Sequence, residues 1–441
     1  MAATAGTTDQ AYRKVVNAWC MYDWANSAFA TTIMAAVLPV YYESVAGQGL
    51  PGNTPTVYWG YTSSIALLVG AVLAPILGSI ADYTGTKKKF LAAFAALGIL
   101  FTALLVLVGT GDWLMASVFA IFGEIGFSAA NIFYDSLLPH VARPEDMDFV
   151  SSKGYALGYL GGGILLAINI AMIMLAPSGT QEMMTRLTFV TVAVWWAVFS
   201  IPLFRRVAEP PRNTEGVPAG TNAVAGGFER LADTFREMSK YRELFKFIVA
   251  FWLYNDGIGT IIKMATIYGA EIGIGQTSLI GALLLTQFVG IPFSLLFGRF
   301  GRQVGAKRSI VIGLGWYTLI SIGGYFMSQA WHFWALAFAV GMVQGGTQAL
   351  SRSLFGVMAP RAKSAEFFGF YDVSAKFAGI LGPALFAVVG QLAGSSRLSI
   401  VSLVIFFIVG GWLLTRVDEQ AGIRVAEAEN AVAGCYRANT N

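Results

Sequence analysis

Long runs of apolar residues dominate the chain, and short polar segments separate one run from the next. Twelve runs are close to the length of about 20 apolar residues that a helix needs to cross a hydrocarbon core roughly 30 Å thick. A segment inside the bilayer must satisfy its own backbone hydrogen bonds, so each run is predicted to be a helix. The predicted spans cover residues 16–42, 57–81, 88–109, 113–140, 151–176, 184–205, 244–270, 276–298, 308–328, 332–358, 367–393 and 398–416.

Composition and charge agree with a membrane protein. Of the 441 residues, 56% are hydrophobic and 12% are charged, whereas soluble proteins carry about 25% charged residues. The Lys and Arg residues gather in alternate loops and in both tails, and the opposite loops hold only Arg186 and Arg397. This bias marks the cytoplasmic side. We therefore expect a multi-pass protein with both termini in the cytoplasm and no nucleic-acid partner. The membrane expected is a bacterial inner membrane.

No cofactor or metal site is expected. Cys20 and Cys435 have neither disulfide nor zinc spacing, and His140 and His332 lie far apart. The chain has no Walker-type phosphate loop, so ATP is not the expected energy source. The first apolar run is too long for the core of a signal peptide and is expected to remain as the first helix.

Two segments repeat each other. The segment from Gly78 to Lys89 follows the second span, and the segment from Gly298 to Arg308 follows the eighth, at an offset of 298 − 78 = 220 residues. Duplication of a six-helix unit is the simplest explanation. The expected fold is therefore an all-α membrane protein with twelve transmembrane helices in two pseudo-symmetric six-helix halves. The expected divisions are an N-terminal half (1–205), a cytoplasmic linker with an amphipathic helix (206–243), a C-terminal half (244–416) and a cytoplasmic tail (417–441).

The amphipathic helix is predicted from the second part of the linker. Phe228, Leu231, Phe235, Met238 and Phe245 recur near helical spacing among basic residues. Such a helix would lie on the cytoplasmic leaflet. A solvated, charged linker is the alternative.

The segment from Gly78 to Lys89 resembles the signature of the major facilitator superfamily. The shared pattern is a glycine, an aspartate four residues on, a glycine three residues later and then basic residues; Tyr83 and Thr86 replace the usual basic residues. The resemblance implies the superfamily's fold, with a central cavity lined chiefly by helices 1, 4, 7 and 10. It also implies that Asp82 and the basic residues 87–89 brace the contact between the halves when the cytoplasmic side is closed.

A narrower resemblance covers both halves. Several blocks look like those of the vacuole-effluxer-like family of major facilitators, whose fungal namesake exports amino acids from the vacuole. These blocks are Tyr22–Thr31, Ser151–Tyr159, Tyr254–Gly257, Gln348–Phe355 and Glu366–Tyr371. The resemblance implies a transporter more firmly than it implies an amino acid as cargo.

Ionisable residues inside the membrane gather on spans 1, 4, 5, 7, 10 and 11. A charge at this depth costs about 2.5–3.5 kcal/mol, so such residues usually face a bundle interior or a water-filled cavity. Polar residues near mid-depth are predicted to bind substrate: Asn26, Glu124, Asn131, Tyr134, Tyr254, Asn255, Asp256, Lys263, Gln344 and Gln348.

Three charges in this set suggest how a zwitterionic solute would be held. Lys263 would bind its anionic end, and Glu124 or Asp256 its cationic end. The alternative is that Asp256 and Lys263, seven residues apart on one helix, only neutralise each other. A carboxylate withdrawn from water also holds a proton more readily, so both acids are candidates for proton coupling.

A second group lies nearer the cytoplasmic ends of the spans. These residues are predicted to form ion pairs that close the cytoplasmic side in the outward-facing state: Asp23, Asp82, Asp135, Lys153, Arg352, Asp372 and Lys376. Static pairing within the bundle is the alternative. In the first span, Asp23 is assigned to this group, whereas Asn26 lies closer to the midplane and is the better candidate for contact with cargo.

The function expected from these features is secondary active transport. A small polar or zwitterionic, amino-acid-like solute would cross the membrane by alternating access, coupled to protons. A transporter or flippase of lipid-like or amphipathic compounds is the alternative, and a polytopic sensor or enzyme is a remote one, because no nucleophile–base pair stands out. The expected partners are the solute, the lipid bilayer and protons, and the expected state is a monomer that is not an enzyme.

Overall fold

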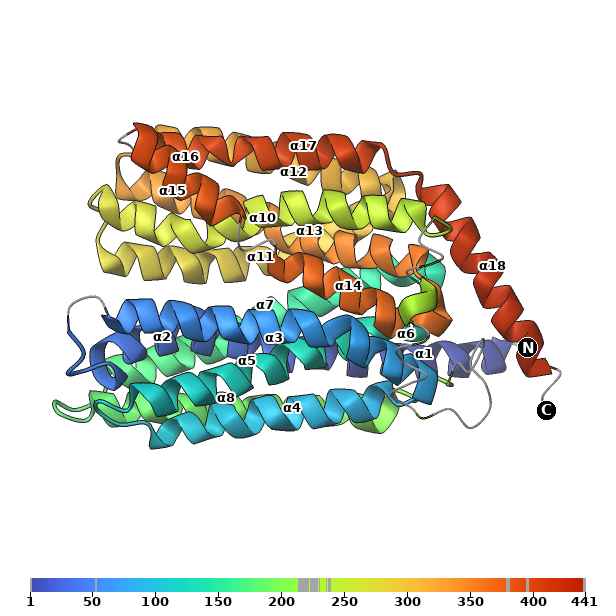
Figure 1. The fold of residues 1–441 in the computed structure, drawn as a ribbon, viewed down its shortest axis with the longest axis horizontal. Helices are drawn as coiled ribbons and strands as arrows, with labels where there is room; N and C mark the ends of the chain where they lie inside the picture. Colours follow the sequence, from blue (N-terminus) through green and yellow to red (C-terminus); the bar gives the residue numbers. More distant parts are fainter. Residues whose placement is uncertain are drawn as a thin grey trace. The chain divides into compact units, whose positions relative to one another are not determined.

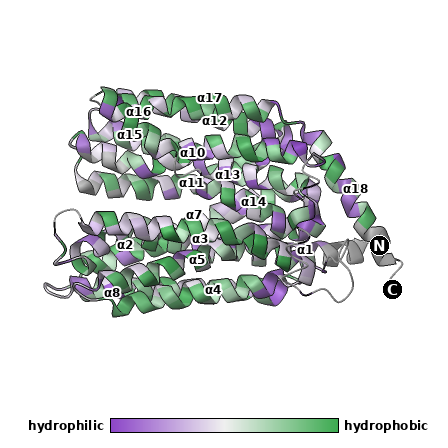
Figure 2. Cartoon of the chain, viewed as in Figure 1, coloured by the Kyte–Doolittle hydropathy of each residue, from purple (hydrophilic) through white to green (hydrophobic). Residues whose placement is uncertain are grey.

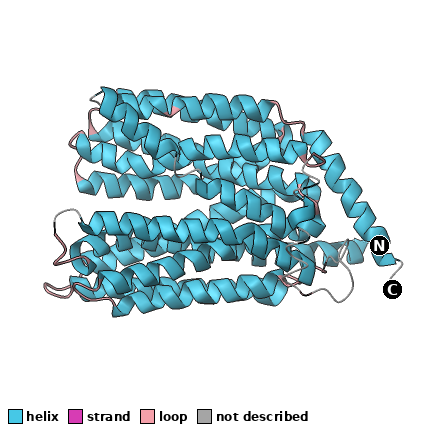
Figure 3. Cartoon of the chain, viewed as in Figure 1, coloured by secondary structure: helices cyan, strands magenta, loops and turns pink. Residues whose placement is uncertain are grey.

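The structure is a computed structural model that describes residues 2–51, 54–212, 222, 229, 231–234, 236, 239–377, 381–393 and 396–438 (Figure 1). Hydrophobic residues run along helices such as α4, α8 and α17 (Figure 2). Among the described residues the regular elements are all helices, without a strand (Figure 3). Ten helical stretches in this part of the chain are long and apolar enough to cross a membrane. The predicted all-α membrane fold is confirmed.

The first six predicted spans coincide with helices of the N-terminal half. Their elements are α1 (Ala2–Ala28), η1 (Phe29–Val37), α2 (Leu38–Tyr41), η2 (Tyr42–Ala46), α3 (Thr54–Thr84), α4 (Lys87–Leu104), η3 (Leu105–Leu107), α5 (Trp113–Ser136), α6 (Leu138–Val141), η4 (Pro144–Asp146), α7 (Met147–Met174) and α8 (Gln181–Arg206).

The second six spans follow a linker, and the amphipathic helix expected there falls largely outside the described residues. The elements are α10 (Arg242–Glu271), α11 (Gln276–Val304), α12 (Ala306–Tyr325), α13 (Ala330–Met358), η5 (Arg361–Lys363), α14 (Ser364–Phe377), α15 (Leu381–Ala393), α16 (Ser396–Ser402), α17 (Val404–Thr415) and α18 (Glu419–Ala438). The last of these, α18, forms most of the predicted tail.

Span 1 is not a uniform α-helix. Its C-terminal part is π-helical over η1 and η2. Both tyrosines at the junction of α2 and η2 are buried and hydrogen-bonded: the Tyr41 hydroxyl donates to the Val108 carbonyl oxygen at 2.8 Å, and the Tyr42 hydroxyl lies 2.7 Å from Ser117 Oγ. Apolar periodicity in the sequence did not predict this π-helical geometry.

Contacts between Cα atoms group the chain into two compact units. The first comprises Met1–Ala74, Gly85–Leu137 and Leu157–Pro211, and the second comprises Pro75–Thr84, Leu138–Ala156 and Arg212–Asn441. The second unit thus includes the last turns of α3 and the segment from α6 to the first turns of α7. The division into halves at the linker remains a prediction.

Helix pairing repeats in the two units. In the first unit α1 packs on α8, and α4 packs on α5 and α8. In the second unit α10 packs on α17, and α12 packs on α13 and α17. These pairs join spans 1–6, 3–4 and 3–6 in one case and spans 7–12, 9–10 and 9–12 in the other. The matching partners agree with a duplicated six-helix unit.

Glycines bring some of these helices into backbone contact. A Cβ atom on Gly126 of α5 would overlap the backbone of Gly98 on α4, and a Cβ atom on Gly98 would meet the indole of Trp196 on α8. Small residues are the means by which membrane helices approach closely. Here they fix α5, which carries several of the predicted site residues, against α4.

Candidate functional site

In the first unit, two asparagines join spans 1 and 4 near mid-depth. The side-chain amide of Asn26 on α1 donates to Asn131 Oδ1 on α5 at 2.5 Å, and Asn26 is buried. Both are among the predicted substrate-binding residues. This bond does not use Asn26 Oδ1 or the side-chain N–H groups of Asn131, so these groups can bind other partners.

Tyr134 lies with the predicted gate residue of the same helix pair. Its hydroxyl donates to Asp23 Oδ2 at 2.8 Å, and its ring stacks on Trp19 with centroids 4.5 Å apart. The indole N–H of Trp19 donates to the Tyr134 carbonyl oxygen at 3.1 Å. The structure therefore places Tyr134 beside Asp23 rather than beside Asn26.

The acids of α5 complete the predicted residues in the first unit. Glu124 Oε1 accepts a hydrogen bond from the hydroxyl of Ser128, four residues on, at 3.3 Å. Asp135 lies at the other end of α5 and is half-buried.

In the second unit, the hydroxyls of Tyr254 and Ser351 lie 2.6 Å apart and join α10 to α13. Asn255 follows Tyr254 on α10 and is half-buried. These spans, 7 and 10, correspond by the repeat to spans 1 and 4, which the asparagine pair joins. A polar link between the same two helices is thus present in each half.

Asp256 is completely buried on α10, with no ion pair to any described residue. Its carboxylate lies near the backbone of Leu381 and Gly382, but neither carboxylate oxygen has a hydrogen-bond partner among the described residues. A Cβ atom on Gly382 would come 2.8 Å from Asp256 Oδ1. Lys263 is exposed and forms no ion pair with Asp256.

Gln344 lines an apolar cavity of about 90 Å³ inside the C-terminal half, among α10, α11, α12 and α13. Its Oε1 atom is buried and has no hydrogen-bond partner in the described part of the chain. Gln348 lies one turn further along α13 and is half-buried.

Near the other end of the spans, Asp82 caps a helix. Its Oδ2 atom accepts the backbone N–H of Glu366, in the first turn of α14, at 2.8 Å. Asp82 is 1% exposed. One turn earlier, a Cβ atom on Gly78 would overlap the backbone of Ala365. The end of span 2 is thus fixed against the start of span 11.

The second copy of the repeat makes the corresponding contact. A Cβ atom on Gly298 of α11 would lie 2.6 Å from Ser152 on α7, so the end of span 8 is fixed against the start of span 5. Arg302 reaches Asp146 with an Nη1–Oδ1 distance of 3.6 Å. The offsets 302 − 82 = 220 and 366 − 146 = 220 show that these residues occupy equivalent places in the two contacts.

Arg352 joins α13 to α7. Its Nε and Nη2 atoms donate to Ser151 Oγ and to the Ser151 carbonyl oxygen, both at 2.9 Å, and its guanidinium lies 4.4 Å from the centre of the Tyr155 ring. Ser151 Oγ in turn donates to the Ala349 carbonyl oxygen at 2.7 Å. The hydroxyl of Ser353 donates to Asp148 on the same α7 turn. Spans 5 and 10 are therefore joined by a buried polar network.

The remaining predicted gate residues are distributed differently. Asp372 pairs with Lys376, four residues on along α14. Lys153 is half-buried on α7 in the second unit, whereas Asp135 belongs to the first.

The basic segment after span 2 contacts its own half. The ammonium of Lys88 donates to the carbonyl oxygens of Phe204 at 3.1 Å and Val207 at 2.5 Å, and its backbone N–H donates to Glu209 at 2.8 Å. Burial raises the pKa of Glu209, although the N–H and charge of Lys88 act in the opposite direction. Lys88 therefore fixes α4 to the end of α8, whereas the resemblance implies a contact between halves.

The C-terminal helix α18 is fixed by polar contacts that the sequence does not reveal. Glu429 accepts hydrogen bonds from Lys240 and, at 2.7 Å, from the Tyr241 hydroxyl, and Lys363 lies 3.9 Å away. Burial disfavours the ionised form of Glu429, but these hydrogen bonds and the charge of Lys363 outweigh it and lower its pKa. Beneath α18 a pocket of about 420 Å³ reaches Asp148.

Sequence reasoning also missed the small residues that make the inner contacts. Ser151 and Ser152 stand in one of the blocks that resemble the family, but charge singles out only their neighbour Lys153. The partner of Asp82 is a backbone N–H group, which no side-chain pattern reveals. The repeated glycines could have predicted these contacts from the sequence, because Gly78 lies against Ala365 and Gly298 lies against Ser152.

Comparisons with known proteins agree with this architecture. The family model described as "Vacuole effluxer Atg22 like" matches residues 11–148 and 144–427. The uncharacterized MFS-type transporter YxiO of Bacillus subtilis (strain 168) is 40% identical over 424 residues, covering 95% of this chain and 98% of that protein. Autophagy-related protein 22 of Coccidioides immitis (strain RS) is 23% identical, covering 97% and 90% respectively.

The fold is that of solved major facilitators. The proton:xylose symporter XylE, bound to 6-bromo-6-deoxy-D-glucose, superimposes with a TM-score of 0.74 at 15% identity, covering 95% of this chain and 99% of that chain. The chain therefore belongs to the vacuole effluxer Atg22-like family and is an integral, multi-pass transporter of the major facilitator superfamily, not an enzyme.

Proposed function

We propose that this transporter moves a small zwitterionic, amino-acid-like solute by alternating access, with protons as the coupling ion. It acts as a monomer in a bacterial inner membrane, with both termini in the cytoplasm as the distribution of Lys and Arg indicates.

The observation that carries this proposal is the buried carboxylate of Asp256. It lies about half-way through span 7, forms no ion pair with a described residue, and lies close to Gly382 of α15. An acid at membrane depth that does not form a structural ion pair indicates a substrate or proton site. It would accept either the ammonium of a solute or a proton in its place.

Two other groups supply the rest of a polar solute's contacts. Lys263, two turns along α10 and exposed, would bind a carboxylate. In the first unit, the Asn26–Asn131 pair offers donors and acceptors of its own. A few fixed polar groups among apolar and aromatic walls are typical of a site for a small molecule.

The contacts at the inner ends of the spans support the alternating-access part. Span 2 meets span 11 through Asp82, and spans 5 and 10 meet through Arg352. Such joined cytoplasmic ends belong to a state that opens outward. Gate closure by these contacts rather than static packing is therefore the mechanism we propose.

Reconstituted protein tests the proposal. A thermal-stability screen of amino acids, peptides, sugars and lysolipids should yield stabilisation by an amino-acid-like ligand, and a pH step across liposomes should drive its uptake. Asp256→Asn should abolish the pH-driven component, and Glu124→Gln serves as the comparison for the second candidate acid.

Three results would contradict parts of the proposal. Uptake that survives in both variants with its pH dependence intact removes proton coupling through these acids. Stabilisation by lysolipids alone favours an amphipathic cargo. Retained ligand stabilisation in Asp256→Asn together with Lys263→Gln would place the site elsewhere.

A further inference from the structure

A groove of about 630 Å³ lies between the first turns of α10 and the end of α17 in the second unit. Its wall is apolar, with Phe245 and Val249 from α10 and Leu413 from α17. The orientation proposed above places it where the cytoplasmic leaflet meets water. An acyl chain would find apolar contact along this wall.

Cations line the same groove. They are Arg242, Lys246 and Arg416, and no acidic residue is among the described residues that line it. Arg242 also begins α10, where the helix dipole adds positive potential. The groove thus has an apolar wall to which basic residues contribute.

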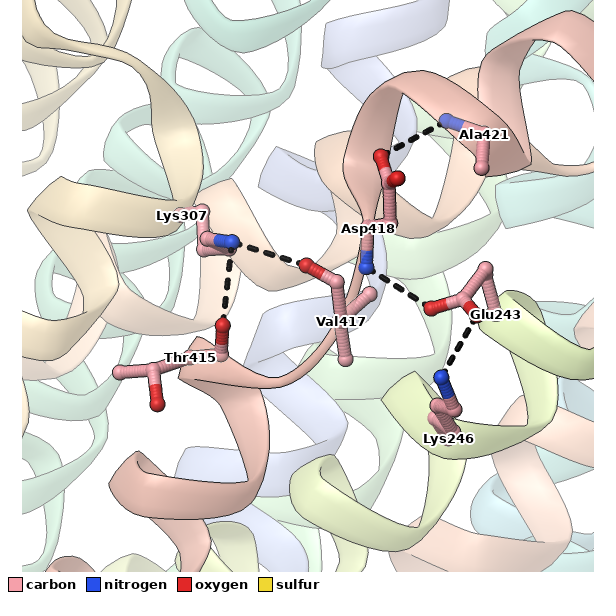
Figure 4. Close-up of polar contacts among 7 residues, drawn as sticks. All are labelled: Glu243, Lys246, Lys307, Thr415, Val417, Asp418 and Ala421. Atoms are coloured by element: carbon pink, nitrogen blue, oxygen red, sulfur yellow. Dashed lines mark hydrogen bonds and ion pairs between the residues drawn. The ribbon is translucent and has the colours of Figure 1, made fainter.

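Neighbouring contacts hold this groove together and pair Lys246 with Glu243 (Figure 4). Glu243 uses one oxygen to accept from Lys246 at 2.6 Å and the other to accept the backbone N–H of Asp418 at 2.8 Å. Lys307 donates to the Val417 carbonyl oxygen at 2.8 Å. These bonds fix the start of α10 to the turn between α17 and α18.

The two arginines remain available. Neither Arg242 nor Arg416 forms an ion pair with a described residue, and both are exposed. The Arg416 guanidinium lies 5.0 Å from the centre of the Trp412 ring, and Trp412 is itself exposed. Tryptophan is enriched where membrane helices meet the headgroup region.

The first unit contains a matching groove of about 400 Å³ between the corresponding helices, α1 and α8. Its apolar lining includes Met21 and Ile201, and its cations are Arg205 and Arg206. Both arginines are exposed and neither forms an ion pair with a described residue. The same combination therefore occurs at spans 1 and 6 and at spans 7 and 12.

We propose that each groove binds one anionic phospholipid of the cytoplasmic leaflet. The phosphate lies on the arginines, whose fork of donors matches phosphate oxygens, and one acyl chain follows the apolar wall. Basic pockets between membrane helices on the cytoplasmic side are typical sites for anionic headgroups. Free phosphate would use the cations but leave the apolar wall uncovered.

Native mass spectrometry of the full-length protein in non-ionic detergent tests this proposal, with phosphatidylglycerol and phosphatidylcholine as probes. We expect the wild type to retain two phosphatidylglycerol molecules in preference to phosphatidylcholine. Arg242→Gln/Arg416→Gln should retain one, Arg205→Gln/Arg206→Gln the other, and the fourfold variant none. Loss of two arginines should weaken each site about thirty-fold.

A matched control removes the same number of charges outside the grooves. Arg308→Gln/Arg424→Gln changes two exposed basic residues near α12 and on α18 and should still retain two lipids. Should a double variant not fold, the single Arg416→Gln variant should bind phosphatidylglycerol more weakly in the groove between α10 and α17. Its melting temperature in detergent without lipid should be unchanged.

Several results would overturn the proposal. They are equal retention of phosphatidylcholine, displacement of the lipid by millimolar inorganic phosphate, equal loss of lipid in the control variant, and undiminished retention in the groove variants. The first three identify, respectively, a non-specific annular lipid, a free-anion site and diffuse surface charge.

Discussion

The carboxylate of Asp82 and the backbone N–H of Glu366 lie 2.8 Å apart, so an acid at the end of α3 caps the first turn of α14. The helix dipole favours the negative charge at this place. Gly78 permits the approach because it has no Cβ atom to meet Ala365. The relationship joins spans 2 and 11 through a main-chain group.

Asp82→Ala should shift the transporter toward the inward-facing state. A hydrogen bond to a charged group contributes about 1.5–3 kcal/mol, which corresponds to a tenfold or larger change in the equilibrium at about 1.4 kcal/mol per factor of ten. A cysteine introduced at the buried Ala359, in a Cys435→Ser background, should be alkylated correspondingly faster. Asp112→Ala, which removes a hydrogen bond to Gly109 in an exposed turn, should leave that rate unchanged. Equal rates in Asp82→Ala and wild type would contradict the gate role.

Gly78→Ala and Gly298→Ala should both prevent closure of the inner side. Each new methyl would meet atoms of the opposing helix, Ala365 in one case and Ser152 in the other. Transport should fall to near zero. The melting temperature should stay near that of the wild type, because the conformation with the inner side open does not need this contact. Gly315→Ala is the matched control, since nothing lies within 4 Å of the place that its Cβ atom would take. Normal transport in both test variants would show that the contacts open or adjust freely.

Arg352→Lys should weaken the inner contact far more than Arg302→Lys. Arg352 is buried and gives two hydrogen bonds to Ser151 while stacking on Tyr155, a geometry that an ammonium cannot reproduce. Arg302 is 48% exposed and 3.6 Å from Asp146, and such surface pairs contribute about 0–1 kcal/mol. The alkylation assay should therefore respond strongly to the first substitution and little to the second. A stronger response to Arg302→Lys than to Arg352→Lys would show that the Arg302–Asp146 pair closes the inner side.

Asn26→Ala and Asn131→Ala should couple in a double-mutant cycle. Either single change leaves the other amide, buried in Asn26 and half-buried in Asn131, without its partner, at a cost of up to about 1–3 kcal/mol. The double variant should therefore be less destabilised than the sum of the single variants. The melting temperature measures the loss of stability in each variant. Affinity for a stabilising ligand measures the contribution of the pair to substrate binding, and this affinity should fall in Asn26→Ala even after correction for the loss of stability. Additive effects on both readouts would remove the pair from the site.

Docking of α18 should depend on pH through Glu429. Its pKa is lowered from an ordinary value of 4.5, so the stabilisation is present above that pH and is lost as pH falls through the lowered value. Hydrogen exchange of α18 should therefore be slow at neutral pH and faster in acid, and Glu429→Gln should exchange fast at both. Glu427→Gln, at an exposed position on the same helix, should behave like the wild type.

The spans themselves were predictable because twenty apolar residues in succession have few structural alternatives. Chain-wide duplication was also readable, since Gly78 and Gly298 stand in matching segments. The inner contacts were less accessible: charge drew attention to Lys153, whereas Ser151 makes the bonds to Arg352. Asp82 was recognised, yet its partner is a main-chain group. Contacts between hydroxyls, carbonyls and N–H groups leave no mark in composition or charge, so only the folded structure reveals them.

The π-helical C-terminal part of span 1 has a practical consequence for assigning the faces of this span. A turn of π-helix contains more residues than a turn of α-helix, so residues beyond η1 point to other sides of the helix than an unbroken wheel drawn from Asn26 would assign. Tyr41 and Tyr42 illustrate this, because these successive residues are both buried and hydrogen-bonded. A helical wheel for span 1 of this chain must therefore be restarted after residue 28, or its later positions will be assigned to the wrong side.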